Sequence, residues 1–266
     1  MSARSEPDAT APLLELRGVN KSFGVAHVLH DIDFRVYPGE VTALVGDNGA
    51  GKSTLVKVIA GIHPIDTGSY WFQGEQVGVH GPNDVSALGV EVVYQDLALC
   101  DNLDIVENMF LGRELKHRGL LDEARMETMA RDALKSLSVR TVTSVRQAVS
   151  SLSGGQRQTV AIAKSVLWNS KVVLLDEPTA ALGVAQTRQV IDLVRRLADQ
   201  GVGVVLISHN MVDVFEVADR ICALYLGRVA ADVKAADVSH SQVVELITAG
   251  RSGSLGLAPA QAAESM

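Results

Sequence analysis

The chain has 266 residues, of which 47% are hydrophobic, so it can bury one large α/β core or a core domain that carries a subdomain. A formal net charge of −7, with no block of consecutive basic residues, makes nucleic acid a poor candidate partner. Because the first twelve residues do not resemble a signal peptide and no apolar run reaches about 18 residues, we expect any membrane association to go through a partner.

The N-terminal part of the chain predicts a short leader followed by strands. Residues 1–11 are small, polar and proline-bearing, which is typical of a disordered leader. Alternating apolar residues predict strands at 13–19 and 32–36. Between these strands lies Phe23, whose ring could stack on a nucleotide base. The alternative is a buried aromatic at the end of a strand.

A glycine-rich loop follows the apolar run 41–45 and leads into an apolar helix, in the pattern GxxxxGK[ST]. Glycines there let backbone N–H groups surround a polyphosphate, and the start of the helix adds favourable partial charge. Lys52 would reach the β and γ phosphates, and Ser53 would bind Mg²⁺. The alternative is an ordinary turn between two core elements. The predicted phosphate-binding loop consists of Gly46, Asp47, Asn48, Gly49, Ala50, Gly51, Lys52, Ser53 and Thr54.

Two further short strands precede a change of character in the chain. Residues 69–72 predict one strand, and the β-branched run 90–94 predicts another that ends at Gln95. From about residue 96 to residue 164 strands disappear, and apolar residues recur at helical spacing over 126–137. We therefore expect a helical subdomain, at about 96–164, inserted into the sheet domain.

A second candidate anion site begins at Ser153. Serine and the two glycines that follow it stand at the start of a helix predicted to run towards Trp168, and such a start exposes several N–H donors. An ordinary helix cap is an equally good interpretation of these residues. The segment consists of Ser153, Gly154, Gly155 and Gln156.

Two buried strands are followed directly by chemically active side chains. The apolar run 172–175 ends at Asp176 and Glu177, where open α/β sheets place their chemistry. Asp176 would hold Mg²⁺, and Glu177 would polarise an attacking water; a solvated turn is the alternative. The apolar run 203–207 leads to His209, which could donate to a γ phosphate.

The C-terminal part of the chain predicts two helices, a hairpin and a tail. Helices are expected at 184–200 and 241–249. The segments 221–225 and 228–230 predict a hairpin around Gly227. Beyond Gly250 the chain is rich in Gly, Ala and Ser, so we expect residues 251–266 to form a flexible tail.

The order of these motifs resembles the nucleotide-binding subunit of ATP-binding cassette (ABC) transporters. A P-loop, a glutamine after a strand, LSGGQ, VVLLDEP and ISH follow one another, and the LSGGQ segment marks the family. The resemblance implies one ATPase domain over residues 12–250. Its expected fold class is α/β: a P-loop NTPase core with a parallel sheet, an N-terminal antiparallel β subdomain and an inserted α-helical signature subdomain.

The resemblance also implies roles for the candidate residues and a hydrolytic reaction with ATP and Mg²⁺ as cofactors. Two chains would form a head-to-tail homodimer, in which the signature residues from Ser153 to Gln156 contact ATP on the partner's P-loop. Phe23 would stack on adenine, and Gln95 would sense Mg²⁺ and the γ phosphate. Glu177 would be the catalytic base, assisted by Lys52 and by His209 as the switch histidine.

One segment points to a subfamily. Residues 108–114, Asn-Met-Phe-Leu-Gly-Arg-Glu, are similar to the ENxFLGRE segment of ATPases from ribose, xylose and fructose importers. This similarity implies a permease, an extracytoplasmic sugar-binding protein and a place on the cytoplasmic face of the inner membrane. Many of those ATPases fuse two cassettes, whereas this chain has one P-loop. It also has Gly183 where the family's D-loop often has Asp, which puts the communication between the two sites in doubt.

Three other classes of ABC protein must be weighed against a sugar importer. An exporter cassette is often fused to its membrane domain, and this chain has no such domain. A soluble ABC ATPase that acts on DNA or ribosomes usually carries coiled coils or paired cassettes, which the sequence lacks. A regulator that binds ATP without hydrolysing it would not need Glu177 and His209.

Overall fold

The computed structural model describes residues 11–139 and 141–257. Its largest sheet has six strands in the order β12-β11-β3-β10-β9-β6, and all neighbours are parallel except β11 and β12. Strands β3, β9 and β10 are almost wholly apolar because both faces of the sheet are covered. The strands are β3 (Val41–Gly46), β6 (Val90–Val93), β9 (Val172–Asp176), β10 (Gly203–Ile207), β11 (Arg220–Tyr225) and β12 (Arg228–Lys234).

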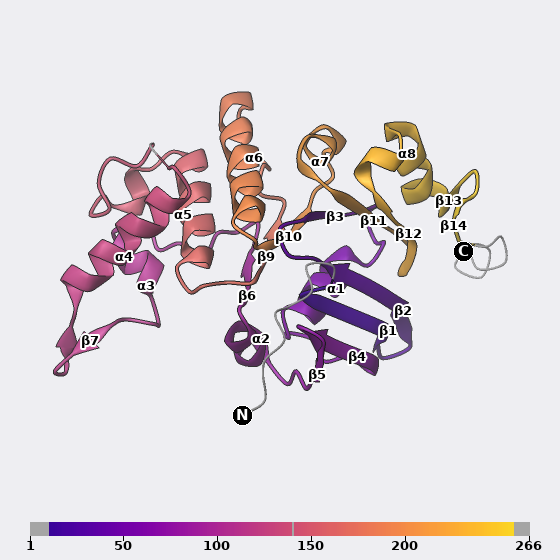
Figure 1. The fold of residues 1–266 in the computed structure, drawn as a ribbon, viewed down its shortest axis with the longest axis horizontal. Helices are drawn as coiled ribbons and strands as arrows, with labels where there is room; N and C mark the ends of the chain where they lie inside the picture. Colours follow the sequence, from indigo (N-terminus) through magenta and orange to yellow (C-terminus); the bar gives the residue numbers. More distant parts are fainter. Residues whose placement is uncertain (1–10, 140, 258–266) are drawn as a thin grey trace.

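A second, antiparallel sheet has the order β2-β1-β4-β5. Helix α1 (Lys52–Ile59) shares one hydrophobic core with this sheet and with the central sheet, so it lies between them. Figure 1 shows the antiparallel sheet below the central one. The expected N-terminal antiparallel β subdomain is thus present. Its strands are β1 (Leu14–Phe23), β2 (Ala26–Val36), β4 (Thr67–Phe72) and β5 (Glu75–Val77).

Helices cover the opposite face of the central sheet, as Figure 1 shows for α6, α7 and α8. Helix α6 buries one face, with Val190, Leu193 and Leu197 among its buried residues, as its apolar spacing predicts. A short helix, α2, follows β5 and begins with proline at its first position. The helices on that face are α6 (Val184–Asp199), α7 (Met211–Val217) and α8 (His240–Ala249), and a 3-10 turn at Ala235–Asp237 precedes α8. Helix α2 (Pro82–Leu88) instead contributes Val85 to the core that α1 shares with the antiparallel sheet.

The expected helical subdomain forms a separate lobe between β6 and β9 (Figure 1). Its elements are α3 (Ile105–Phe110), α4 (Glu123–Ser136), a 3-10 turn at Val149–Ser151 and α5 (Gly154–Val166). The expectation that strands disappear in this region is wrong in one place. Strands β7 (Lys116–His117) and β8 (Leu120–Leu121) form a small hairpin, because Arg118 and Gly119 both adopt positive φ and turn the chain within two residues.

The end of the described chain also differs from the expectation. Strands β13 (Arg251–Ser252) and β14 (Leu255–Gly256) form a hairpin, and Leu255 and Leu257 pack on the core beneath α8. The predicted flexible tail is therefore wrong for residues 251–257. Residues 258–266, and residues 1–10 of the predicted leader, lie outside the described residues. Among the described helices, none has both the length and the apolar character needed to cross a bilayer.

Candidate active site

The predicted active residues follow neighbouring strands of the central sheet. The loop 46–54 follows β3, His209 follows β10, Asp176 ends β9 and is followed by Glu177, and Gln95 follows β6. These four strands are parallel neighbours in the order β3-β10-β9-β6. Their carboxyl ends therefore lie along one edge of the sheet, where α/β proteins bind ligands.

The phosphate-binding loop has the backbone geometry that its glycines predict. Gly49 and Gly51 have φ values of 83° and 100°, which side chains rarely adopt. A Cβ atom on Gly46 would lie 2.7 Å from the carbonyl oxygen of Leu224, so this position has no room for one. The loop thus exposes backbone N–H groups at the start of α1, as an anion-binding loop requires.

The ammonium group of Lys52 lies over this loop. Its Nζ donates to the carbonyl oxygens of Gly46 at 2.8 Å and Asp47 at 2.9 Å. Burial lowers the pKa of Lys52, while the negative charges of Glu177, Asp47 and Asp176 act in the opposite direction. A phosphate bound in the loop would supply further negative charge beside this ammonium group.

Asp176 and Glu177 form a pair of carboxylates beside Lys52. Burial raises the pKa of Asp176, and the charge of Glu177 raises it further, against the lowering effect of Lys52. Glu177 has a φ of 48°, and its N–H donates to the carbonyl oxygen of Ile207 at 2.9 Å. The end of β9 is thereby fastened to the end of β10.

His209 binds directly to Glu177. The backbone N–H of His209 donates to Glu177 Oε1 at 3.1 Å, and His209 Nδ1 lies 2.8 Å from the same oxygen. The Glu177 side chain is 16% exposed and that of His209 is 77% exposed. The carboxylate is therefore oriented by a histidine that remains open to solvent on its other side.

The oxygen donors at this edge fit a magnesium ion. Ser53 and Gln95 are both exposed and contribute a hydroxyl and an amide oxygen, and Asp176 contributes a carboxylate. Burial raises the pKa of Asp176, and the charge of a divalent cation would favour its ionised form. Among the described residues no three His, Cys, Asp or Glu side chains cluster closely enough to hold a metal by themselves.

Phe23 lies at the end of β1 and is 44% exposed. The alternative of a buried strand-end aromatic is therefore excluded. The edge of the ring packs against His63, with ring centroids 5.0 Å apart, and Lys21 Nζ lies 5.4 Å from the ring centroid. An exposed ring with a nearby cation is suited to stacking on a base.

The signature segment begins α5 as predicted, with Ser153 as its N-cap. Ser153 N–H donates to Gln156 Oε1 at 2.8 Å, and Gln156 Nε2 donates to the carbonyl oxygen of Thr141 at 2.6 Å. The side chain of Gln156 is thus held within its own lobe, while the first turn of the helix carries Gly154 and Gly155, which have no side chains. Figure 1 shows α5 in the helical lobe, away from α1.

Within one chain, the structure brings together Lys52, Asp176, Glu177 and His209. It leaves the signature apart from them.

Two residues at the site were not predicted to act there. The N–H of Gly227 donates to the carbonyl oxygen of Ala50 at 3.0 Å and supports the P-loop from behind. Burial raises the pKa of Tyr94, and the negative charge of the nearby Asp176 raises it further. No sequence pattern indicates either contact, because both depend on which strands are neighbours.

Comparison with known proteins places the chain in a family. A family model described as ABC transporter matches residues 29–180. The xylose/arabinose import ATP-binding protein XylG of Sulfolobus acidocaldarius is 43% identical, over 92% of this chain and 97% of the relative. The fructose import ATP-binding protein FrcA of Rhizobium meliloti is 44% identical, over 91% of this chain and 96% of the relative. A crystal structure of an ATP-binding cassette of an ABC transporter, in its ADP conformation, has the same fold, with a TM-score of 0.76 over 90% of this chain and 96% of that chain at 24% identity.

Proposed function

This chain belongs to the ABC transporter family, and we propose that it is the ATP-hydrolysing subunit of an importer that takes up a monosaccharide through a separate permease. The observation that carries the proposal is its similarity, along nearly the whole of both chains, to ATP-binding proteins named for xylose/arabinose import and fructose import. The segment 108–114 supports the same subfamily. A P-loop beside paired carboxylates supports hydrolysis as the reaction.

In this proposal the reaction needs positioning and charge more than covalent chemistry. The P-loop N–H groups and Lys52 bind the phosphates of ATP. Ser53, Gln95 and Asp176 would hold Mg²⁺, which would supply positive charge beside the phosphate oxygens. Glu177 orients the attacking water, and the exposed face of His209 is available to the γ phosphate.

The working unit in this proposal is a head-to-tail homodimer. The signature lies in a different lobe from the P-loop of the same chain, so a second copy is needed to bring the two together (Figure 1). A two-fold axis would create two equivalent sites, each with the P-loop of one copy and Ser153 to Gln156 of the other. For Gln156 the contact would involve the backbone, because its side chain is already bonded within the lobe.

ATP binding would close this dimer, and hydrolysis followed by phosphate release would reopen it. A ligand that binds only the closed form, at about 100 times its dissociation constant, shifts the equilibrium by roughly 2.7 kcal/mol per site. Two independent sites would double this value, which is enough to move an open-favoured equilibrium across balance. The closing motion would act on the permease at the cytoplasmic face of the membrane. The sugar would reach the permease from an extracytoplasmic binding protein.

The role of Glu177 is tested by replacing it with glutamine. We expect Glu177→Gln to lower the rate of phosphate release at least about 100-fold, since the amide cannot act as a base. ATP should still bind, and light scattering should detect a dimer stabilised by ATP. The control is Glu75→Gln, which changes an exposed glutamate on β5. Turnover at the wild-type rate in Glu177→Gln would contradict the assignment.

The transport role is tested by measuring ATPase activity of the chain with membranes that contain its candidate permease. Sugar-binding protein is then added in separate assays, each time saturated with a different monosaccharide. Strong stimulation by one monosaccharide would support import and identify the cargo. Turnover that ignores both the permease and every sugar would contradict the proposal in favour of an exporter or a soluble ATPase.

A further inference from the structure

A partly buried hydrogen bond joins the loop after Glu177 to helix α7. Thr179 Oγ1 donates to Asp213 Oδ2 at 2.7 Å, although the two residues are 34 positions apart. Asp213 is only 5% exposed. A buried carboxylate is unfavourable unless it is hydrogen-bonded, so this contact satisfies a group that would otherwise destabilise the fold.

The loop that carries Thr179 has an unusual backbone. Glu177 has a φ of 48° and Ala181 a φ of 60°, and neither is a glycine. Such conformations are costly for residues with side chains and persist only where the surroundings hold them. Within the loop, the N–H of Ala180 donates to the carbonyl oxygen of Glu177 at 3.1 Å, and that of Leu182 donates to Thr179 at 3.2 Å. These local bonds do not fix the loop relative to the rest of the site.

The N–H of Glu177 fixes the start of the loop to Ile207 at the end of β10, and two side-chain contacts reach the segment that follows this strand. Glu177 binds the backbone and the imidazole of His209, which follows β10. Thr179 binds Asp213, four residues further along that segment. Two segments of the backbone are therefore joined at both ends and form a closed ring: residues 177–179 and residues 209–213.

We propose that Asp213, acting through Thr179, is a positioning residue that holds the Glu177 carboxylate in register with His209. The inference rests on the proposed function, in which these two side chains act on water and the γ phosphate. Among the described residues neither Thr179 nor Asp213 has a side-chain hydrogen bond to the P-loop, so loss of their bond should affect the hydrolytic step more than ATP binding. A displacement of about 1 Å at a reacting group can lower a rate about 100-fold.

The test uses Thr179→Val, which keeps the shape of the side chain but removes its hydroxyl. We expect kcat for ATP hydrolysis to fall about tenfold or more while the KM for ATP stays within about twofold, as loss of positioning alone predicts. Thr179→Ser, which restores the hydroxyl, should recover most of the rate. Asp213→Asn should lower kcat as well, because an amide binds the hydroxyl less strongly than a carboxylate does.

The matched control is Arg188→Gln. It removes an exposed ion pair with Glu216, at 3.6 Å, that also reaches α7, from α6, but lies outside the ring. Wild-type kcat in Thr179→Val, or an equal fall in Arg188→Gln, would overturn the inference. An increase in KM without a fall in kcat would also overturn it.

A second measurement does not depend on activity. The imidazole NMR signals of His209, assigned by their loss in His209→Gln, should shift in Thr179→Val and stay in place in Arg188→Gln. Unchanged signals in Thr179→Val would overturn the inference whatever the ATPase rate. Absence of ATP hydrolysis in the wild-type chain would contradict the proposed function alone, because the NMR result still decides whether Thr179 positions His209 and Glu177.

Discussion

Two adjacent carboxylates at the end of β9 share one ammonium group. The side chain of Asp176 is half-buried and lies beside Glu177, so burial first, and then the charge of Glu177, raise the pKa of Asp176. Lys52 only partly offsets this effect. At the scale of single residues, the site is therefore built for cation binding at some expense of stability.

Asp176→Asn should raise the thermal stability of the chain at pH 7. The pKa of Asp176 is raised in the folded state, so its contribution to stability is fully present below the unfolded value of 3.8 and is lost as the pH rises through the folded pKa. The neutral amide avoids this loss. Melting temperatures of both proteins measured from pH 7 down towards pH 4 should show a gain that shrinks as the pH falls. A variant less stable than the wild type at pH 7, or a gain independent of pH, would contradict the prediction.

At the scale of elements, the turn between β11 and β12 supports the P-loop. Gly227 has a φ of 77°, and its N–H donates to Ala50 while its carbonyl oxygen accepts from the N–H of His30 at 2.8 Å. One glycine thus links the P-loop to the antiparallel sheet. A Cβ atom on Gly227 would lie 2.2 Å from the carbonyl oxygen of Val28, a backbone atom that cannot move independently.

Gly227→Ala should therefore destabilise the chain and weaken ATP binding. The control is Gly74→Ala, since Gly74 has a similar φ of 82° but nothing within 4 Å of the added carbon. Positive φ alone should cost about 1–2 kcal/mol in either variant. The additional clash should make the loss in Gly227→Ala clearly larger in urea unfolding, and only this variant should lose ATP affinity. Equal losses of stability in the two variants, with ATP affinity unchanged in both, would contradict a role of the Gly227 turn in supporting the P-loop.

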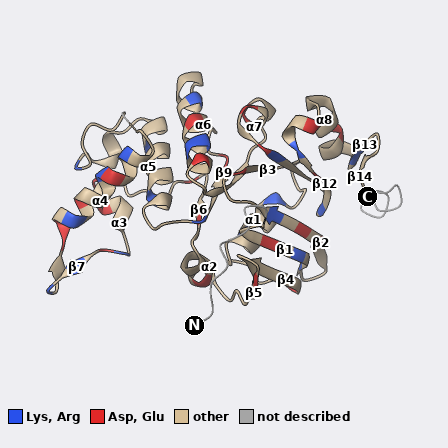
Figure 2. Cartoon of the chain, viewed as in Figure 1, with Lys and Arg blue, Asp and Glu red and all other residues tan. Residues whose placement is uncertain are grey.

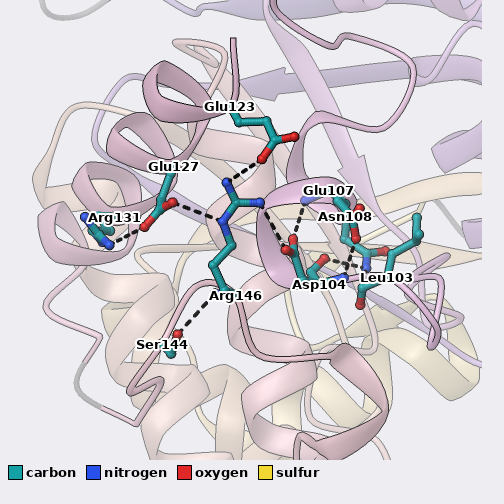
Figure 3. A network of polar contacts seen from close by, with 9 residues as sticks. All are labelled: Leu103, Asp104, Glu107, Asn108, Glu123, Glu127, Arg131, Ser144 and Arg146. Carbon is teal, nitrogen blue, oxygen red and sulfur yellow. Dashed lines mark hydrogen bonds and ion pairs between the residues drawn. The ribbon is translucent and has the colours of Figure 1, made fainter. Parts of the chain in front are cut away.

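A network of charges holds the helical lobe together (Figure 3). Arg146 binds Glu127 at 3.0 Å, Glu123 at 3.2 Å and Asp104 at 3.3 Å. It therefore joins the first two turns of α4, which carry the two glutamates, to the N-cap of α3. Asp104 also caps α3 in a reciprocal pair with Glu107. The segment that carries Arg146 leads directly to the signature, so this network links the two helices to the start of α5.

Arg146→Gln should lower the free energy of unfolding by about 1 kcal/mol at low salt, as expected for a partly exposed network of ion pairs. Three carboxylates would then face one another without their shared cation. In about 1 M salt, where the screening length is about 3 Å, the difference from the wild type should shrink. Arg188→Gln, which removes a single exposed pair, serves as the control and should have a smaller effect. An effect of Arg146→Gln that does not change with salt would contradict an electrostatic role.

At the scale of the whole molecule, the candidate site is divided between two lobes. The P-loop and the carboxylates lie on the central sheet, and the signature lies on the helical lobe (Figure 1). Figure 2 shows Lys and Arg interspersed with Asp and Glu on the helices of both lobes, a pattern that does not favour binding to a polyanion. A second copy of the chain is the partner that this division of the site favours.

Mixing two inactive variants should restore activity if the dimer is head-to-tail. Lys52→Ala disables a P-loop, and Gly154→Asp disables a signature by adding charge at an exposed glycine near the phosphates. A mixed dimer keeps one intact site, formed by the P-loop of one variant and the signature of the other. An equal mixture should therefore recover about a quarter of wild-type turnover if the sites act independently. No recovery, despite mixed dimers detected by light scattering or cross-linking, would contradict a shared site.

The sequence by itself determined the elements that carry strong local patterns. Strand β10 was predicted over its full length because a strand buried on both faces is a continuous apolar run. The P-loop was recognisable because phosphate binding needs glycines and a lysine at fixed spacing, and α6 because one face of it is apolar. These features depend on residues close together in the chain.

The tertiary structure alone decided which distant residues meet. The hairpin of β7 and β8 has two-residue strands and no alternation to reveal it, and the β13–β14 hairpin is held by packing on the core beneath α8. The contacts of Glu177 with His209 and of Thr179 with Asp213 join residues 32 and 34 positions apart. Such contacts depend on the order and register of strands, which are set by the packing of the whole core rather than by any local pattern.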